Sequence, residues 1–403
     1  MAEFIKADRL AEVEISAIVV MSEAARQRRA EGHDVINLGI GEPDFNTPDH
    51  ASQAAISAIQ NHDTHYPPIG GKPELKQAVA ALYHGRGGTS RSAENVIISS
   101  GSKYTLLNAM LASVNPGDEV VVLAPFWTSY ADIIRLCGGV PVVVPTDADN
   151  GFRPDVSAIE SAMSPRTRWL MINSPSNPSG AVLSAEDLRA VGNIVSAHDK
   201  CWLLSDEIYE HIVYDMDFVS VADALGDLAD RTLIINGVSK AYAMTGWRLG
   251  YGVGPAPLIA AMTTAQAQGT SGTATISQAA ALAALTGDQE MLISRQQSFQ
   301  SRRDLVFAHL RGINGLTVSK PQGAFYIFPS WKNLVGWKTP HGMTLKEDLD
   351  FCRYILDAAD TVIIPGSSFA MPGYFRISYA TDTQSLEKAM ARISQAIAAL
   401  QPE

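Results

Sequence analysis

The chain has 403 residues, of which 46% are hydrophobic and 18% are charged, and its formal net charge is −11. This length predicts a large domain with a smaller one, and the negative charge argues against a general binder of nucleic acid or anionic membranes. The three cysteines lie far apart and the nine histidines lack metal-ligand spacing, so we expect neither disulfides nor a metal site. The charged N-terminal stretch has no apolar signal region, and no run approaches the roughly 20 apolar residues of a membrane span. These features predict a cytoplasmic protein.

Short apolar runs alternate with helical patterns from about residue 94 to residue 237. The helical segments 102–113, 130–136 and 185–198 lie between runs of this series. The runs are nearly continuous and rich in β-branched residues, which indicates strands that are covered on both faces. Such an alternation predicts an α/β domain with a mostly parallel sheet. The predicted strands are 95–100, 119–127, 140–146, 168–173, 201–207 and 232–237.

The pattern changes near residue 315. Half-buried strands and helices then follow in an α+β arrangement, which predicts a second, smaller domain. Its predicted elements are strands at 323–329 and 374–380 and helices at 346–359 and 384–400. We expect a large ligand-binding domain at 46–315 and a small domain that combines 1–45 with 316–403.

Reactive or polar residues follow each of several predicted strands. In an open α/β sheet, ligands bind beyond the carboxyl ends of the strands, so these residues are expected to meet at one edge. They are Gly101, Ser102 and Lys103 after the first strand, Trp127 after the second, Asn177 after the fourth, Asp206 and Tyr209 after the fifth, and Lys240 and Arg248 after the sixth.

A phosphate group suits the first of these strand ends. Gly101 and Ser102 open a helix, whose free N–H groups and positive dipole end attract an anion. Arg248 can add a bidentate cation to the same anion. The pattern therefore predicts a phosphate cradle.

The other strand ends suit a planar, cationic ring. Asp206 can pair with a protonated ring nitrogen, and Trp127 or Tyr130 can stack on a planar ligand. Lys240 offers an amine, whose pKa we expect burial and the Arg248 cation to lower, so that more of it is a free nucleophile. A phosphate, a pyridinium and a lysine partner together indicate pyridoxal 5′-phosphate (PLP).

The motif GVSKAYAMTGWRLG, at 237–250, resembles the lysine signature of the class I aminotransferases, which are fold-type I PLP enzymes. The resemblance extends over most of the chain, whose motifs look like those of the aspartate aminotransferase branch. It implies a large domain with a mostly parallel seven-stranded sheet, and a homodimer with shared active sites. The ordered motifs that carry it are GEPDFNTP, HYPPIGGKPELK, NPGDEV, APFWTSY, NSPSNPSG, SDEIYEH, GAFYIFP and FRISYA.

The resemblance implies roles for the residues that contact the cofactor ring. Lys240 would bind PLP covalently and later carry the proton between the substrate and the cofactor. Asp206 would keep the ring nitrogen protonated, and Tyr209 and Asn177 would hydrogen-bond the 3-oxygen. Trp127 would stack on the ring.

Other residues would hold the substrate carboxylate or the phosphate. Arg376 would clamp the α-carboxylate with help from Asn177 and the backbone at Gly41. Tyr66 would reach the phosphate of the neighbouring subunit. Ser239 is a further candidate phosphate contact, although some relatives carry serine three residues before the lysine, where this chain has Gly237.

The expected substrate pair is aspartate and 2-oxoglutarate. Lys103 stands where bacterial relatives that act on dicarboxylates carry a lysine for the distal carboxylate. Relatives that also accept prephenate tend to carry threonine at the position of Ile18, which makes prephenate the less favoured substrate. An aromatic or broad-range aminotransferase, and a PLP-dependent C–S or C–C lyase of the same fold, remain as alternatives.

Overall fold

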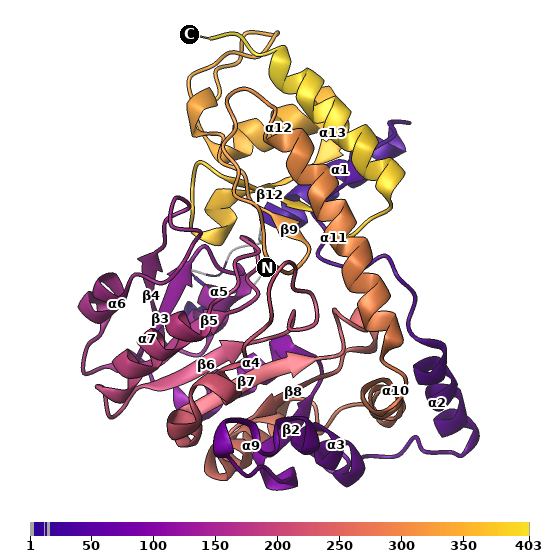
Figure 1. Cartoon of the computed structure of the whole chain (residues 1–403), viewed down its shortest axis with the longest axis vertical. Helices are drawn as coiled ribbons and strands as arrows, with labels where there is room; N and C mark the ends of the chain where they lie inside the picture. The colour runs from indigo at the N-terminus through magenta and orange to yellow at the C-terminus, as the bar shows by residue number, and fades with distance from the viewer. Residues whose placement is uncertain (1–3, 12, 14–16, 403) are drawn as a thin grey trace.

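The computed structural model describes residues 4–11, 13 and 17–402, and its lower half in Figure 1 is built on a seven-stranded sheet. The strand order is β2-β8-β7-β6-β5-β3-β4, and β8 alone among these runs antiparallel to its neighbours. The α/β fold and its mostly parallel sheet are thus confirmed. The strands are β2 (Val96–Ser99), β3 (Glu119–Ala124), β4 (Val140–Pro145), β5 (Thr167–Asn173), β6 (Trp202–Asp206), β7 (Thr232–Gly237) and β8 (Gly250–Val253).

Strand β8 was not predicted from the sequence. It is only four residues long, and two of these, Gly250 and Gly252, are poor strand formers. These glycines have a packing reason, because a Cβ at Gly250 would lie 2.2 Å from the backbone nitrogen of Ser102.

Helices cover both faces of this sheet. Alternate strand residues point to opposite faces of the sheet. Ile98, Leu170 and Leu203 therefore pack in one hydrophobic cluster, together with residues of α3, α7 and α10. Their neighbours Ile97 and Leu204 pack in a second cluster on the other face, together with residues of α4, α5 and α9. The helices of this half are α2 (Asp49–Gln60), α3 (Pro73–Tyr83), α4 (Ser102–Ser113), α5 (Ser129–Leu136), α6 (Val156–Ala162), α7 (Ala185–Ser196), α8 (Val221–Ala224), α9 (Ala256–Gly269) and α10 (Thr275–Thr286).

The upper half in Figure 1 contains short strands and long helices from both ends of the chain. Strand β1 pairs with β10, and β12 lies between β11 and β9 in a second small sheet. The elements are α1 (Ala17–Ala30), β1 (Ile36–Asn37), α11 (Glu290–Leu310), β9 (Tyr326–Ile327), α12 (Asp348–Ala359), β10 (Thr361–Val362), β11 (Ile364–Pro365), β12 (Phe375–Ser378) and α13 (Thr383–Ala398).

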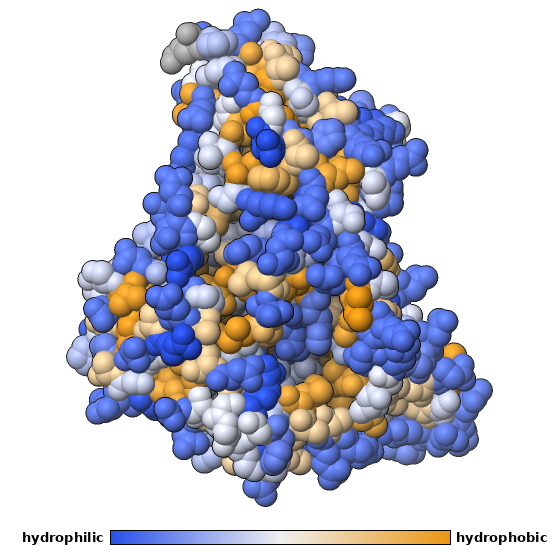
Figure 2. Space-filling view, viewed as in Figure 1, coloured by the Kyte–Doolittle hydropathy of each residue, from blue (hydrophilic) through white to orange (hydrophobic). Residues whose placement is uncertain are grey.

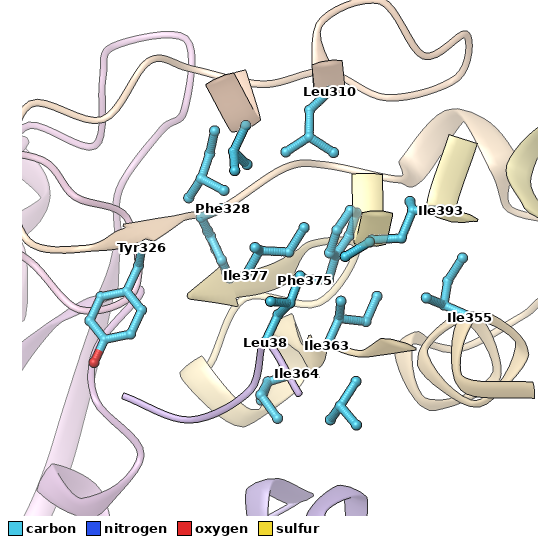
Figure 3. Close-up of a cluster of buried hydrophobic side chains, with 14 of the residues drawn as sticks. Leu38, Leu310, Tyr326, Phe328, Ile355, Ile363, Ile364, Phe375, Ile377 and Ile393 are labelled. Carbon is cyan, nitrogen blue, oxygen red and sulfur yellow. The ribbon is translucent and has the colours of Figure 1, made fainter. Parts of the chain in front are cut away.

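A third hydrophobic cluster holds this half together. Leu38, from the N-terminal part of the chain, packs with Ile355, Ile377 and Ile393 in this cluster (Figure 3). Figure 2 shows hydrophilic residues over much of the surface in this view, with apolar residues in scattered smaller patches between them. No helix in the described part of the chain combines the length and the apolar character that a bilayer crossing requires.

Candidate active site

Asn177, Asp206 and Lys240 lie at or just beyond the carboxyl ends of β5, β6 and β7, where other predicted residues join them. They surround a cavity of about 340 Å³, a volume typical of small-molecule sites. All of the predicted site residues line it except Tyr66 and Gly101, the latter directly preceding the lining residue Ser102. The lining consists of Gly39, Ile40, Gly41, Ser102, Lys103, Trp127, Tyr130, Asn173, Asn177, Asp206, Ile208, Tyr209, Ser239, Lys240, Thr245, Arg248, Tyr326 and Arg376.

Lys240 places its amine in this cavity, three residues beyond the end of β7. Its Nζ donates a hydrogen bond to the carbonyl oxygen of Gly41 at 2.7 Å. Burial, followed by the positive charge of Arg376, lowers the pKa of Lys240 from 10.5 to about 8, although Glu42 opposes the shift. A larger fraction of this amine is therefore unprotonated near neutral pH than of an exposed lysine.

Asp206 is the last residue of β6 and its carboxylate is buried at the cavity wall. One oxygen accepts a hydrogen bond from the Tyr130 hydroxyl at 2.6 Å, and the other accepts one from the backbone N–H of Ile208 at 3.2 Å. Burial raises the pKa of Asp206, while these two hydrogen bonds and the charge of Lys240 oppose the shift. A cationic ligand placed beside it would stabilise its ionised form.

The start of α4 forms a small cradle against the sheet. Gly101 has φ +94°, and a Cβ there would lie 2.6 Å from Nη2 of Arg248. The Ser102 hydroxyl donates to the carbonyl of Asn236 at 2.9 Å, so this side chain fixes the helix start to β7. Arg248 lies on the exposed side and donates through Nη1 to the carbonyl of Thr245. Free helix N–H groups and a guanidinium thus face the same space.

Arg376 lies on β12 and is only 2% exposed. Its Nη1 donates to the side-chain oxygen of Asn177 at 2.9 Å, and its Nη2 donates to the carbonyl of Gly39 at 2.6 Å. The Nε atom is buried without a partner. A buried guanidinium without a carboxylate partner is costly, so this arrangement favours an anionic ligand.

Lys103 and Trp127 line the same wall of the cavity. The ammonium of Lys103 lies 5.1 Å from the centre of the Trp127 ring. Burial lowers the pKa of Lys103, Asp132 opposes this shift, and the Arg248 charge adds to it. Lys103 is thus a further basic group at the cavity, besides Lys240, Arg248 and Arg376.

Tyr66 is not brought into this cavity. Its side chain is 91% exposed, and it lies beside residues 270–276 at the surface. In a single chain Tyr66 is therefore not among the residues that line the cavity. The contact expected with a neighbouring subunit stays a prediction.

Sequence reasoning missed several residues that line the cavity. Tyr130 was considered only as a stacking ring, yet its hydroxyl binds Asp206. Asn173 fixes the loop after β5, because its side chain accepts from the backbone N–H of Asn177 and donates to the carbonyl of Asp206. Tyr326 stood within the quoted motif GAFYIFP, which was the available signal. The side chain of Ile18 lies outside the described residues.

The comparisons with known proteins identify the family of this chain. The family profile "Aminotransferase class I and II" matches residues 33–393. The chain belongs to the class I and II aminotransferases.

Relatives of this aminotransferase cover nearly its whole length. The aspartate aminotransferase of Rhizobium meliloti is 47% identical, over 98% of this chain and 97% of that protein. The aspartate/prephenate aminotransferase of Cereibacter sphaeroides is 43% identical, over 98% of each chain.

Solved structures of aspartate aminotransferases share the fold of this aminotransferase. The structure from Rhizobium meliloti has a TM-score of 0.96 at 46% identity and covers 99% of this chain and 100% of that one. The structure from Thermus thermophilus with maleate has a TM-score of 0.89 at 37% identity and covers 98% of this chain and 100% of that one. The enzyme class and the fold predicted from the sequence are confirmed.

Proposed function

We propose that this enzyme uses PLP to exchange an amino group between aspartate and 2-oxoglutarate. The observation that carries the proposal is the meeting of Lys240, Asp206 and the α4 cradle around one cavity. The enzyme takes an amino group from one substrate, releases a 2-oxo acid, and then returns the group to a second 2-oxo acid.

The residues of the cavity fit PLP. The cradle at Gly101 and Ser102, with Arg248 beside it, suits a phosphate, and a side chain at Gly101 would fill it. Ser239, which directly precedes Lys240 in the chain, is buried and also lines the cavity. The buried Asp206 suits a protonated ring nitrogen, and Trp127 offers a ring for stacking. The amine of Lys240, with its pKa of about 8, suits covalent attachment to an aldehyde.

PLP, when bound, supplies an electron sink for the bonding electrons of the substrate α-carbon. Asp206 would stabilise the positive charge on the protonated ring nitrogen, and that charge would in turn favour the ionised carboxylate of Asp206. Tyr209 and Asn177 provide a hydroxyl and an amide for the ring 3-oxygen. Lys240 would move the proton between the substrate α-carbon and the cofactor, because its lowered pKa leaves part of its amine unprotonated.

Two cations in the cavity suit a dicarboxylate substrate. The buried fork of Arg376 binds the α-carboxylate, for which Gly39 and Asn177 fix its orientation. Gly41 brings its backbone to the same wall. Lys103 binds the distal carboxylate. The names of the Rhizobium meliloti and Thermus thermophilus relatives, the latter solved with the dicarboxylate maleate, support this assignment.

An amino-donor screen with 2-oxoglutarate tests the proposal. We expect the purified enzyme to consume aspartate fastest, to form glutamate, and to convert its cofactor to pyridoxamine phosphate when no oxo acid is present. Lys240→Ala should abolish turnover and the absorbance of the covalently bound cofactor, while PLP still binds without a covalent bond. Turnover by Lys240→Ala equal to that of the wild type would refute the mechanism, and release of pyruvate with ammonia or sulfide would indicate a lyase.

Prephenate is a second candidate substrate. The names of relatives at 39–43% identity, including the Cereibacter sphaeroides enzyme, include prephenate. Assays with prephenate and aspartate, side by side with phenylalanine and tyrosine, measure the breadth of the substrate range. Equal kcat/KM for aspartate and the aromatic amino acids would replace the dicarboxylate proposal with a broad-range enzyme.

We further propose that the enzyme is a homodimer in the cytoplasm. Tyr66, which projects into solvent in a single chain, then reaches the phosphate site of the neighbouring subunit. Three free cysteines, two of them buried, suit a reducing compartment.

A further inference from the structure

Tyr326 joins two parts of the cavity that the sequence analysis treated separately. It lies in β9, is 1% exposed, and pairs across the sheet with Ser378 of β12, the strand that carries Arg376. Its ring centre lies 4.5 Å from the guanidinium carbon of Arg376, and its hydroxyl lies 3.0 Å from the hydroxyl of Tyr209. Figure 3 shows this side chain at the margin of the hydrophobic cluster, with its hydroxyl directed away from the other labelled residues.

We propose that Tyr326 is a positioning residue with two separable functions, one for each end of its side chain. The ring orients Arg376 for the substrate α-carboxylate, and the hydroxyl orients Tyr209 toward the cofactor. The inference rests on the proposed function, because it concerns the same substrate and cofactor.

The ring supports Arg376 without using any of its hydrogen-bond donors. The guanidinium lies between two aromatic rings, since Phe369 is 4.9 Å away in addition to Tyr326. The side-chain oxygen of Asn177 accepts one hydrogen bond from Nη1, and the Gly39 carbonyl accepts one from Nη2. The unpartnered Nε and the remaining donors are left for a carboxylate. Ring contacts on a desolvated guanidinium are worth about 1–2 kcal/mol, which is roughly a 5- to 30-fold change in binding.

The hydroxyl acts on Tyr209. In a buried pair of hydroxyls, each oxygen can donate one hydrogen bond and also accept one. When Tyr209 donates to the cofactor 3-oxygen, its oxygen accepts from Tyr326, which strengthens Tyr209 as a donor through the chain of hydrogen bonds. Gly41 packs against this hydroxyl, because a Cβ there would lie 2.2 Å from it. The hydroxyl is thus held between Tyr209 and the backbone that accepts from Lys240.

Two substitutions in the PLP-loaded enzyme separate these functions. Tyr326→Phe keeps the ring and removes the hydroxyl. We expect the pH midpoint of the cofactor's visible absorbance to rise by about 0.5–1 unit, since a weaker Tyr209 donor stabilises the negative 3-oxygen less. KM for aspartate should change less than about 2-fold. Tyr326→Met removes the ring, and we expect KM for aspartate and for phenylalanine to rise together by about 5- to 30-fold, because both substrates carry the α-carboxylate.

Tyr214→Phe is the matched control. Tyr214 is also fully buried, and its hydroxyl donates to the carbonyl of Ala324, two residues from Tyr326, outside the cavity lining. The control loses a buried hydrogen bond and should leave both the midpoint and KM as in the wild type. Tyr326→Leu replaces Tyr326→Met if that variant does not fold.

The outcomes distinguish the inference from the proposed function. A midpoint in Tyr326→Phe that equals the wild type or Tyr214→Phe overturns the function of the hydroxyl. A ring-free variant that lowers kcat without raising KM overturns the function of the ring. If the wild type neither binds PLP nor transaminates, the proposed function itself fails.

Discussion

At the scale of single residues, burial changes the chemistry of the ionisable side chains at this sheet edge. Lys240 and Asp206 both lie where water is scarce, and their pKa values move in opposite directions, each toward the neutral form. Their neighbours then decide what each can do. The Gly41 carbonyl orients the amine, and the Tyr130 hydroxyl holds the carboxylate.

Lys103 provides a test of substrate preference. Lys103→Ala should raise KM for aspartate by at least about 10-fold, since a charge-assisted hydrogen bond of about 1.5–3 kcal/mol is lost, and should leave phenylalanine nearly unchanged. Steady-state kinetics with both donors measure this. Arg376→Lys is the control, and it should weaken both donors because a point charge replaces a fork. Equal losses for both donors in Lys103→Ala would remove the basis for dicarboxylate preference.

Glu207 provides a test of stability against pH. It is buried beside Asp206 and accepts from Ser205, Ser220 and the backbone of Val221. Burial raises its pKa from 4.5 to about 7, so between these pH values the folded protein retains a proton that the unfolded chain has released. Stability from this group is present below pH 4.5 and is lost as the pH rises to 7.

Glu207→Gln removes this titration because its amide stays neutral. The free energy of unfolding of the variant, relative to the wild type, should therefore be higher at pH 8 than at pH 5, by up to about 3 kcal/mol. Urea denaturation of both proteins at the two pH values measures the difference. The same relative stability at both pH values would show that Glu207 is ionised throughout.

At the scale of elements, the site depends on how closely α4 approaches the sheet. The glycines at 101, 237 and 250 leave room for the start of this helix, since a Cβ at Gly237 would lie 2.8 Å from the Ser102 hydroxyl. The glycine-rich β8 could not be predicted as a strand, because its residues were selected for close approach rather than for strand propensity. The apolar β-branched strands were predictable, because their pattern follows directly from burial on both faces.

Gly250→Ala tests this approach. The added methyl group would lie 2.2 Å from the Ser102 nitrogen, so α4 must move away from β8. We expect a loss of about 1–3 kcal/mol in the free energy of unfolding and weaker binding of PLP to the apoenzyme. Gly246→Ala is the matched control, because no atom lies within 4 Å of its Cβ position. Unchanged PLP affinity in Gly250→Ala would show that the cradle tolerates the displacement.

At the scale of the whole molecule, the cavity combines residues that are far apart in the chain. Arg376 contacts Gly39 and Asn177, from which it is separated by 337 and 199 positions. We propose that 46–315 act as the large domain and that 1–45 with 316–403 act as the small one. The cavity then lies between them, with Lys240 from the first and Arg376 from the second.

A complementation experiment tests the shared active site. A mixed dimer of Lys240→Ala and Tyr66→Ala subunits should regain activity that neither homodimer has. One of its two sites then combines the native Lys240 of one subunit with the native Tyr66 of the other. Activity measured after the two variants are unfolded and refolded together provides the readout. Lack of any recovery would place Tyr66 outside the partner's site.

The sequence by itself determined the layer architecture, the enzyme family and most of the cavity lining. These are local properties, since apolar runs, glycines at turns and the residues that follow each strand can be read along the chain. Only the tertiary structure decided that Tyr130 holds Asp206, that Tyr326 joins Arg376 to Tyr209, and that Tyr66 projects away from its own subunit's cavity. These depend on side chains from distant elements meeting at hydrogen-bonding distance, and the spacing of residues along one chain carries no information about that distance.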